Sequence, residues 1–114
     1  MIHTSEFRVV LCTCGSAAEA SAVARGLVER EFAACVNIVP AVRSVYRWQG
    51  AVEEADEHLL LIKTRADLLA AVEATIRELH NYEVPEVLVL EVMGGSNDYL
   101  GWLAANLQVQ SSTP

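Results

Sequence analysis

The feature that most constrains this chain is a pair of strand-like segments, Ala34–Trp48 and Ala51–Thr64, separated only by Gln49-Gly50. A two-residue connection with glycine in second place is typical of a β-hairpin. At roughly 3.3 Å per residue each arm spans about 45 Å, whereas a compact chain of this length has a radius of gyration of about 13 Å. The tip therefore lies beyond the chain's own core, although it carries Tyr46 and Trp48. Because apolar groups on a projecting ribbon require a partner, the sequence predicts self-association.

Composition sets the class of protein. The 114 residues suffice for a single domain over 1–114, with a core at about 7–107 and tails at 1–6 and 108–114. The hydrophobic content of 53% fits an oligomer with apolar interfaces. A net charge of −7 argues against a nucleic-acid partner, and no apolar run reaches the ~18–20 residues of a membrane span. The N-terminus lacks the pattern of a secretory signal.

Three cysteines, Cys12, Cys14 and Cys35, form an odd set without a disulfide framework. Cys12 and Cys14 point the same way from one strand, and neither belongs to a Cys-x-x-Cys motif. This usage predicts reduced thiols in a cytoplasmic protein.

The order of the remaining segments predicts the fold. Outside the hairpin we expect two buried strands, Phe7–Thr13 and Val87–Val92. The first helix is expected to run from the capping box Ser16–Glu19 to near Glu31, and the second from a cap signal at Thr64–Asp67 to near His80. A third helix is expected from 96 to Leu107. Strand–helix–strand occurs twice, joined by the hairpin, and an extra C-terminal helix follows. This is the α+β, ferredoxin-like split βαβ arrangement. Right-handed crossovers place both helices on one face of a four-stranded antiparallel sheet and leave the other face bare.

The hairpin itself divides into two halves. Pro40 predicts a bend or bulge, so the inner half belongs to the sheet and the outer half projects as an assembly arm. If Trp48 faces Ala51, Arg43 faces Asp56 in a cross-strand ion pair. The acidic residues of the second arm are interpreted as a solvated face, with a site for a hard cation as the alternative: Glu53, Glu54, Asp56 and Glu57.

Motifs for common chemistries are absent. The loop at residues 14–17 lacks the Arg that an acylphosphatase requires, and Leu59–Ile62 lacks the aromatic and basic residues of an RNA-recognition module. We find no Gly-x-x-x-x-Gly-Lys, Gly-x-Ser-x-Gly or His-Glu-x-x-His motif, so we expect no enzyme. The thiol of Cys12 and the imidazole of His80 suit copper or zinc. The alternative is a buried core thiol and a helix-capping histidine. His3 and His58 are interpreted as surface residues.

A second candidate group combines six polar and aromatic residues near the root of the hairpin and the loop before the last strand: Cys35, Asn37, Trp48, Lys63, Tyr82 and Glu86. Lys63 and Glu86 are single charges beside apolar strands, and such charges are seldom buried without a partner. The group predicts either a polar ligand cleft between subunits or an interface salt bridge with no ligand.

Six segments spread between Phe7 and Leu107 resemble a known family. They are Val10-Leu-Cys-Thr13, Ala33-Ala-Cys-Val-Asn-Ile38, Ser44-Val-Tyr-Arg-Trp-Gln-Gly50, Ile62-Lys-Thr64, Tyr82-Glu-Val-Pro-Glu86 and Asp98-Tyr-Leu-Gly-Trp102. Together they are similar to the CutA divalent-cation-tolerance family. The resemblance implies a ferredoxin-like subunit in a PII-like homotrimer, whose hairpins extend the sheets of neighbouring copies. It also implies a cytoplasmic protein of divalent-cation tolerance, with copper binding in some members.

The resemblance carries specific residues with it. Where family members bind copper, the ligands are a Cys on the first strand and two His before the Tyr-x-x-Pro-Glu loop. Here Cys12 and His80 match, whereas Leu79 stands in place of the first His and Asn81 in place of the usual proline. The leading hypothesis is a non-enzymatic homotrimer that binds copper, another divalent metal or a small ligand. The alternatives are an adaptor trimer for a partner protein and a small-molecule sensor using Lys63 and Glu86 without metal.

Overall fold

The structure is a computed structural model that describes residues 6–109. His3 and most of both expected tails lie outside the described residues. The described chain forms β1 (Phe7–Cys14), α1 (Ala17–Glu29), β2 (Cys35–Trp48), β3 (Ala51–Arg65), the 3-10 helix η1 (Ala66–Leu68), α2 (Leu69–Leu79), β4 (Leu88–Glu91) and α3 (Asn97–Ala105).

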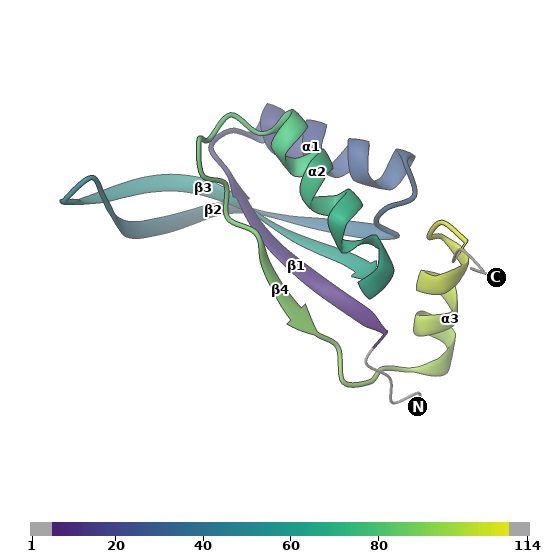
Figure 1. The fold of residues 1–114 in the computed structure, drawn as a ribbon. Coiled ribbons are helices and arrows are strands. Elements are labelled where there is room, and N and C mark those ends of the chain that lie inside the picture. The colour runs from purple at the N-terminus through teal and green to yellow at the C-terminus, as the bar shows by residue number, and fades with distance from the viewer. Residues whose placement is uncertain (1–5, 110–114) are drawn as a thin grey trace.

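The strands of the described chain form one antiparallel sheet in the order β2-β3-β1-β4 (Figure 1). Strand β1 pairs with β3 over its whole length and with β4 over residues 8–11. Each βαβ half contributes one central and one edge strand, so the predicted ferredoxin-like α+β fold is confirmed. Cys12 and Cys14 therefore lie on a central strand.

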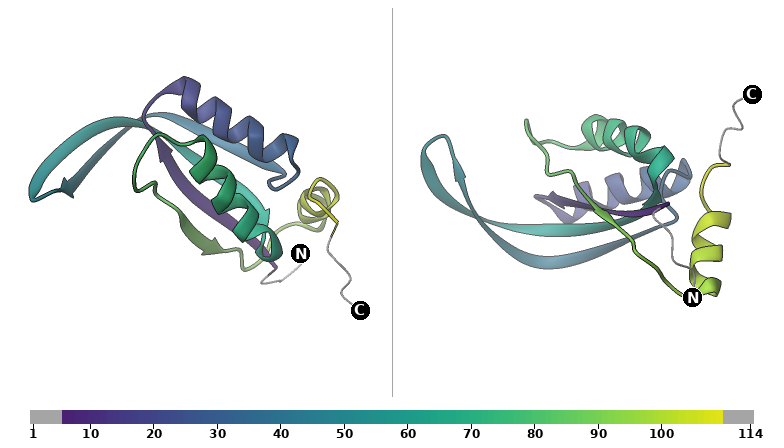
Figure 2. Two further views of the ribbon diagram at one scale, coloured as in Figure 1. Left: turned by 45° about the horizontal axis from the view of Figure 1, so that its top comes forward. Right: turned by 60° about the horizontal axis from the view of Figure 1, so that its bottom comes forward.

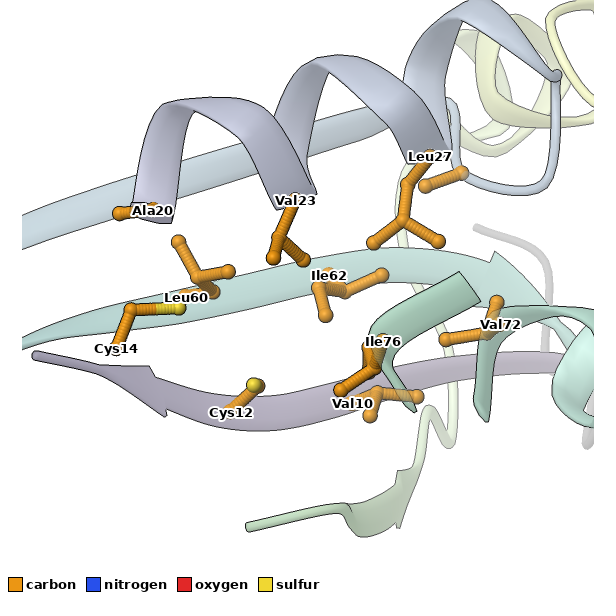
Figure 3. Packing of buried hydrophobic residues seen from close by; sticks show 11 residues of the cluster. Val10, Cys12, Cys14, Ala20, Val23, Leu27, Leu60, Ile62, Val72 and Ile76 are labelled. Atoms are coloured by element: carbon orange, nitrogen blue, oxygen red, sulfur yellow. The ribbon is translucent and has the colours of Figure 1, made fainter. Parts of the chain in front are cut away.

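Helices α1 and α2 cover the same face of the sheet (Figure 2). Ala20, Val23 and Leu27 of α1 recur at helical spacing and are fully buried. They pack with side chains of β1, β3 and α2, namely Val10, Cys12, Cys14, Leu60, Ile62, Val72 and Ile76 (Figure 3). Burying one large aliphatic side chain contributes about 1.5–3 kcal/mol, so this layer fixes the strand that carries the two thiols.

The two main helices begin differently. Ser16 Oγ accepts from the backbone N–H of Glu19 at 3.1 Å, which confirms the predicted N-cap. Glu19 also reaches back, but its Oε1 accepts from the N–H of Gly15 at 3.2 Å, one residue before the N-cap, and not from Ser16 as a capping box requires. The predicted cap at Thr64 is wrong. Thr64 still belongs to β3, is fully buried, and donates its hydroxyl to the carbonyl oxygen of Phe32 at 2.6 Å. The Thr64 side chain therefore serves the contact with Phe32 and caps no helix; η1 and then α2 follow β3 without a side-chain cap.

The β2–β3 hairpin projects from the body (Figure 1), and the longest dimension of the chain is 48 Å. The register shifts between Val39 and Val42, around Pro40, where the sequence predicts a bend. Beyond it Arg43 faces Asp56, and their side chains are 3.4 Å apart, as predicted. Both turn residues at the tip, 49 and 50, have positive φ (50° and 84°), as the primed hairpin turns require.

The sheet face opposite α1 and α2 is uncovered over much of its area (Figure 2). Val39 of β2 and Leu88 and Leu90 of β4 are 38%, 56% and 49% exposed on it. The expectation that Val87–Val92 is buried is therefore wrong, because β4 is an edge strand that no further element of the described chain covers. Helix α3 packs against Phe7 at one end of the sheet only.

Candidate functional site

Three soft ligand groups converge at the end of β1. Ligand atoms of Cys12, Cys14 and His80 all lie within 4.8 Å of one another. Both thiols are fully buried, and they point from β1 toward the helical layer (Figure 3). Residues i and i+2 of a strand share a face, so β1 presents the two sulfurs together. We refer to Cys12, Cys14 and His80 as the thiol–imidazole site.

His80 is placed by the end of α2, which it caps. Its Nε2 lies 2.6 Å from the carbonyl oxygen of Thr13, and its Nδ1 accepts from the backbone N–H of Tyr82 at 3.0 Å. Because a carbonyl oxygen is an acceptor and the Tyr82 N–H is a donor, we assign the neutral tautomer with the proton on Nε2. The imidazole is thereby held between β1 and the loop after α2.

Glu19 borders the thiol–imidazole site from the first turn of α1. Its side chain is 6% exposed, and its Oε1 lies 4.0 Å from His80 Nε2. The carboxylate accepts from two backbone donors, Gly15 N–H at 3.2 Å and Asn81 N–H at 2.7 Å. Glu19 therefore joins α1, the end of β1 and the loop after α2 at one point.

The protonation of the Cys12 thiol follows from its surroundings. The hydrogen bond with Cys14 raises the pKa of the Cys12 thiol strongly, and burial and the nearby carboxylates of Glu86 and Glu19 raise it further. Cys12 is consequently a neutral thiol at physiological pH. A cation that binds here must displace thiol protons. Buried sulfur and nitrogen donors at this spacing fit a thiophilic ion, and carboxylates close by complement a positive charge.

A polar cleft adjoins the site on the side of the hairpin arm. It has a volume of about 500 Å³ and is lined by Thr13, Ser44, Val45, Tyr46, Glu57, Tyr82, Val84, Pro85 and Glu86. The Tyr82 hydroxyl donates to Glu57 Oε2 at 2.8 Å. Burial, and secondly the charge of Glu57, raises the pKa of Glu86. The cleft is therefore acidic, and no Lys or Arg is among the residues that line it.

The structure divides the six residues of the predicted cleft into two groups. Tyr82 and Glu86 line the acidic cleft, and Trp48 lines a neighbouring hollow that also contains Tyr82. Cys35 and Asn37 lie farther along the sheet, where Cys35 faces Lys63 and Asn37 faces Leu61. The ammonium group of Lys63 contacts the Tyr99 hydroxyl at 3.2 Å. Whether a second copy reunites the two groups stays a prediction.

Sequence reasoning missed or misplaced four residues near these sites. Cys14 was recognised only as a thiol on the same strand face as Cys12, and Glu19 only as a capping residue. Glu57, expected on a solvated face, is 6% exposed because the loop that carries Tyr82 covers it. His58, expected at the surface, is half-buried opposite Cys14, and its Nδ1 has no hydrogen-bond partner among the described residues.

Comparison with known proteins gives consistent matches over most of the chain. A family model described as CutA1 divalent ion tolerance protein matches residues 8–106. The divalent-cation tolerance protein CutA of Thermus thermophilus is 46% identical over 98 residues, which cover 86% of this chain and 95% of the relative. A chloroplastic CutA protein of Arabidopsis thaliana is 44% identical over 95 residues, which are 83% of this chain and 52% of that relative.

Solved structures of CutA1 proteins have a similar fold. The crystal structure of CutA1 from Oryza sativa matches with a TM-score of 0.89 at 39% sequence identity, covering 94% of this chain and 98% of that one. The chain thus spans nearly the whole bacterial relative and about half of the plant relative that carries a chloroplastic name.

Proposed function

The chain belongs to the CutA1 divalent ion tolerance family, and from this premise we propose that it binds a metal ion through Cys12, Cys14 and His80. The observation that carries the proposal is the convergence of three soft ligand atoms within 4.8 Å. Thiolate and imidazole are ligands that zinc and copper accept. The protein acts by holding the ion, as a tolerance protein and not as an enzyme.

Each residue of the thiol–imidazole site has a defined part in binding. Cys12 and Cys14 release their protons to solvent and bind as thiolates. His80 binds through nitrogen after giving up one of its present hydrogen bonds, to Thr13 or to Tyr82. The bound ion supplies a positive charge close to the carboxylates of Glu19 and Glu86, which act on Cys12.

We further infer that the working form is a homotrimer of the PII-like kind. Two features support it: the uncovered apolar sheet face, and an arm whose Val45 and Val52 are 63% and 64% exposed. Lys63 and Glu57 are six residues apart on β3, about 20 Å at the rise of a strand. Within one chain the Lys63 ammonium therefore cannot reach the acidic cleft. We propose that Lys63 of a neighbouring copy, packed head to tail on the sheet, pairs with Glu86.

Metal titration tests the proposal. The reduced protein and its Cys12→Ala and Cys35→Ala variants are titrated with Cu(I), Cu(II) and Zn(II) against a competing chelator. Cys35 is the matched control, because it is a free cysteine on β2 that is not part of the thiol–imidazole site. We expect Cys12→Ala to lose binding and Cys35→Ala to keep it. Equal binding by wild type and Cys12→Ala would overturn the metal proposal.

A second candidate function is the binding of a small cationic ligand in the acidic cleft. The specific observation is that Glu57 and Glu86 share a 500 Å³ space whose lining contains no Lys or Arg. A ligand that binds only the folded state raises its melting temperature. Screening amines and other cationic metabolites by thermal shift, with Glu86→Gln as the control, tests this candidate. A library without a hit that depends on Glu86 removes its support.

The free cysteines are the basis for a proposal about the cellular compartment. All the cysteines are free, which favours a reducing compartment, and we place the protein in the cytoplasm. Within the described residues, no helix combines the length and the apolar character needed to cross a membrane.

A further inference from the structure

We propose that Glu19 is the fourth ligand of the thiol–imidazole site, so that Cys12, Cys14, His80 and Glu19 close around one four-coordinate divalent ion of the zinc class. This inference rests on the proposed function, because it uses the same three ligands. It goes further in naming a ligand, a coordination number and a preference between ions.

Glu19 is a buried carboxylate without a cationic partner. Its side chain is 6% exposed, and its nearest basic group in the described chain is His80, at 4.0 Å. The Nδ1 of His80 accepts a hydrogen bond from Tyr82, which holds that imidazole in its neutral form. The two other contacts of Glu19 are neutral backbone N–H groups. Buried charges in proteins are normally paired or bind a metal.

The contacts of Glu19 leave room for a metal ion. A carboxylate has about four lone-pair sites, and the two backbone N–H groups occupy only one on each oxygen. Oε1, the oxygen that accepts from Gly15, is also the one that lies 4.0 Å from His80 Nε2. The same oxygen therefore keeps a free lone pair beside the imidazole while it continues to accept from Gly15.

The spacing of the three soft ligands fits a tetrahedral ion after a small contraction, and Glu19 joins them by a rotation of its side chain. Zinc binds sulfur at about 2.3 Å and nitrogen or oxygen at about 2.0–2.2 Å, which places neighbouring ligand atoms about 3.3–3.8 Å apart. The three soft ligand atoms lie within 4.8 Å of one another, and Glu19 Oε1 lies 4.0 Å from His80 Nε2. The three soft ligands close on the ion by inward movements of about 1 Å. Glu19 does not belong to the group within 4.8 Å, so its side chain must turn its carboxylate toward the two sulfurs to complete the shell.

The donor set determines which ion is preferred. Two thiolates, one neutral imidazole and one carboxylate carry three negative charges, so a divalent ion leaves less unbalanced charge than a monovalent one. Zinc accepts sulfur, nitrogen and oxygen ligands, whereas Cu(I) selects soft thiolate and thioether ligands. Glu19 thus adds to zinc affinity and contributes little to Cu(I) affinity. With all four positions filled by protein there is no open position for substrate, as expected of a binding site and not of a catalytic one.

The test compares zinc with Cu(I) in three proteins: wild type, Glu19→Gln and Ser16→Ala. Affinities are measured by competition with chromophoric chelators under reducing, anaerobic conditions. Ser16→Ala is the matched control, since it removes the side-chain cap of α1 and leaves every proposed ligand in place. We expect Glu19→Gln to weaken zinc binding by more than about tenfold, the loss that even an outer-shell partner produces. We expect it to change Cu(I) binding by less than threefold, and Ser16→Ala to leave both affinities within threefold of wild type.

A purely structural role for Glu19 gives a different result. It would weaken zinc and Cu(I) binding equally, and Ser16→Ala would do the same; either that outcome or unchanged zinc binding in Glu19→Gln overturns the proposal. If Cys12→Ala loses zinc binding and Glu19→Gln keeps it, the proposal that Glu19 is a ligand is refuted and the metal-binding proposal stands. If Cys12→Ala binds zinc as the wild type does, the metal-binding proposal itself is refuted. Should Glu19→Gln not fold, Glu19→Asp replaces it, because it keeps the negative charge and withdraws the oxygens by one methylene. Glu19→Asp must then weaken zinc binding more than Cu(I) binding, as required of Glu19→Gln.

Discussion

Removing the Tyr82 hydroxyl is expected to destabilise the protein through Glu57. The hydroxyl donates to Glu57 Oε2 at 2.8 Å, and Glu57 is 6% exposed. A hydrogen bond to a charged group contributes about 1.5–3 kcal/mol. Because Tyr82 is 38% exposed, water replaces part of the bond. We therefore expect Tyr82→Phe to lower the free energy of unfolding by about 1.5 kcal/mol at pH 7, the lower end of that range.

The pH dependence of this loss distinguishes the hydrogen bond from packing of the ring. Burial raises the pKa of Tyr82, and its hydrogen bond to Glu57 and the charge of that carboxylate raise it further. A pKa raised in the folded state gives a stabilisation that is present below the unfolded value of about 10 and is lost as the pH rises above it. Between pH 10 and 11 the wild type should lose up to about 1.4 kcal/mol relative to Tyr82→Phe, and less where solvent screens the exposed ring.

Denaturation in guanidinium chloride at equal protein concentration, at pH 7 and pH 11, measures both effects. Tyr46→Phe is the matched control. Tyr46 lines the same cleft and is 41% exposed, and its hydroxyl makes no hydrogen bond among the described residues. The reasoning is refuted if Tyr82→Phe is as stable as Tyr46→Phe at pH 7, or if its stability deficit is the same at both pH values.

The remaining predictions concern assembly and local packing. Trp48→Ala is expected to weaken the assembly; an unchanged mass by size-exclusion with light scattering, together with an unchanged melting temperature, would contradict the proposed role of the arm. A Cβ at Gly15 would lie 2.9 Å from the Tyr82 hydroxyl, whereas one at Gly101 in α3 meets nothing within 4 Å. Thermal unfolding should show Gly15→Ala destabilised by about 1–3 kcal/mol, because the added methyl group pushes the Tyr82 hydroxyl away from Glu57. Gly101→Ala should be stabilised by about 0.5–1 kcal/mol. If both variants change stability in the same direction, the packing described is contradicted. Lys63→Glu and Glu86→Lys should each lower the melting temperature of the assembly, and the double variant should recover part of it; no recovery would mean that the two residues do not pair between copies.

The fold was predictable because its signals are local. Ser16 caps α1 as predicted, Gln49-Gly50 forms the predicted turn, and Pro40 marks the predicted change of register. Each signal rests on backbone hydrogen bonding or φ preference within a few residues. The predicted helix cap at Thr64 was wrong because the environment of this residue is set by a distant part of the chain. Its hydroxyl is bound by Phe32, a residue 32 positions away, and no local pattern contains that partner.

The candidate site was predictable only in part, since its ligands come from three separate elements. Cys12 and His80 were identified as a thiol and an imidazole that suit copper or zinc, and the family resemblance pointed to the same two residues. Strand periodicity placed Cys14 on the same face as Cys12 without indicating that it lies next to His80. Glu57 was misplaced because its burial depends on the loop that carries Tyr82, which the sequence does not locate. Side chains whose environment is set by a distant loop are the ones that periodicity cannot describe.

The residue type at position 19 carries an argument of its own. A capping box is formed equally well by Gln or Glu, and a neutral Gln is less costly to bury than a carboxylate. At 6% exposure, beside the Cys12 thiol whose pKa its charge raises, Glu19 bears a desolvation cost that capping does not require. A cation between Cys12, Cys14 and His80 removes that cost and turns the same carboxylate into a ligand. The charge of Glu19 is therefore better explained by the ion than by the helix, and the comparison of zinc with Cu(I) in Glu19→Gln decides between the two.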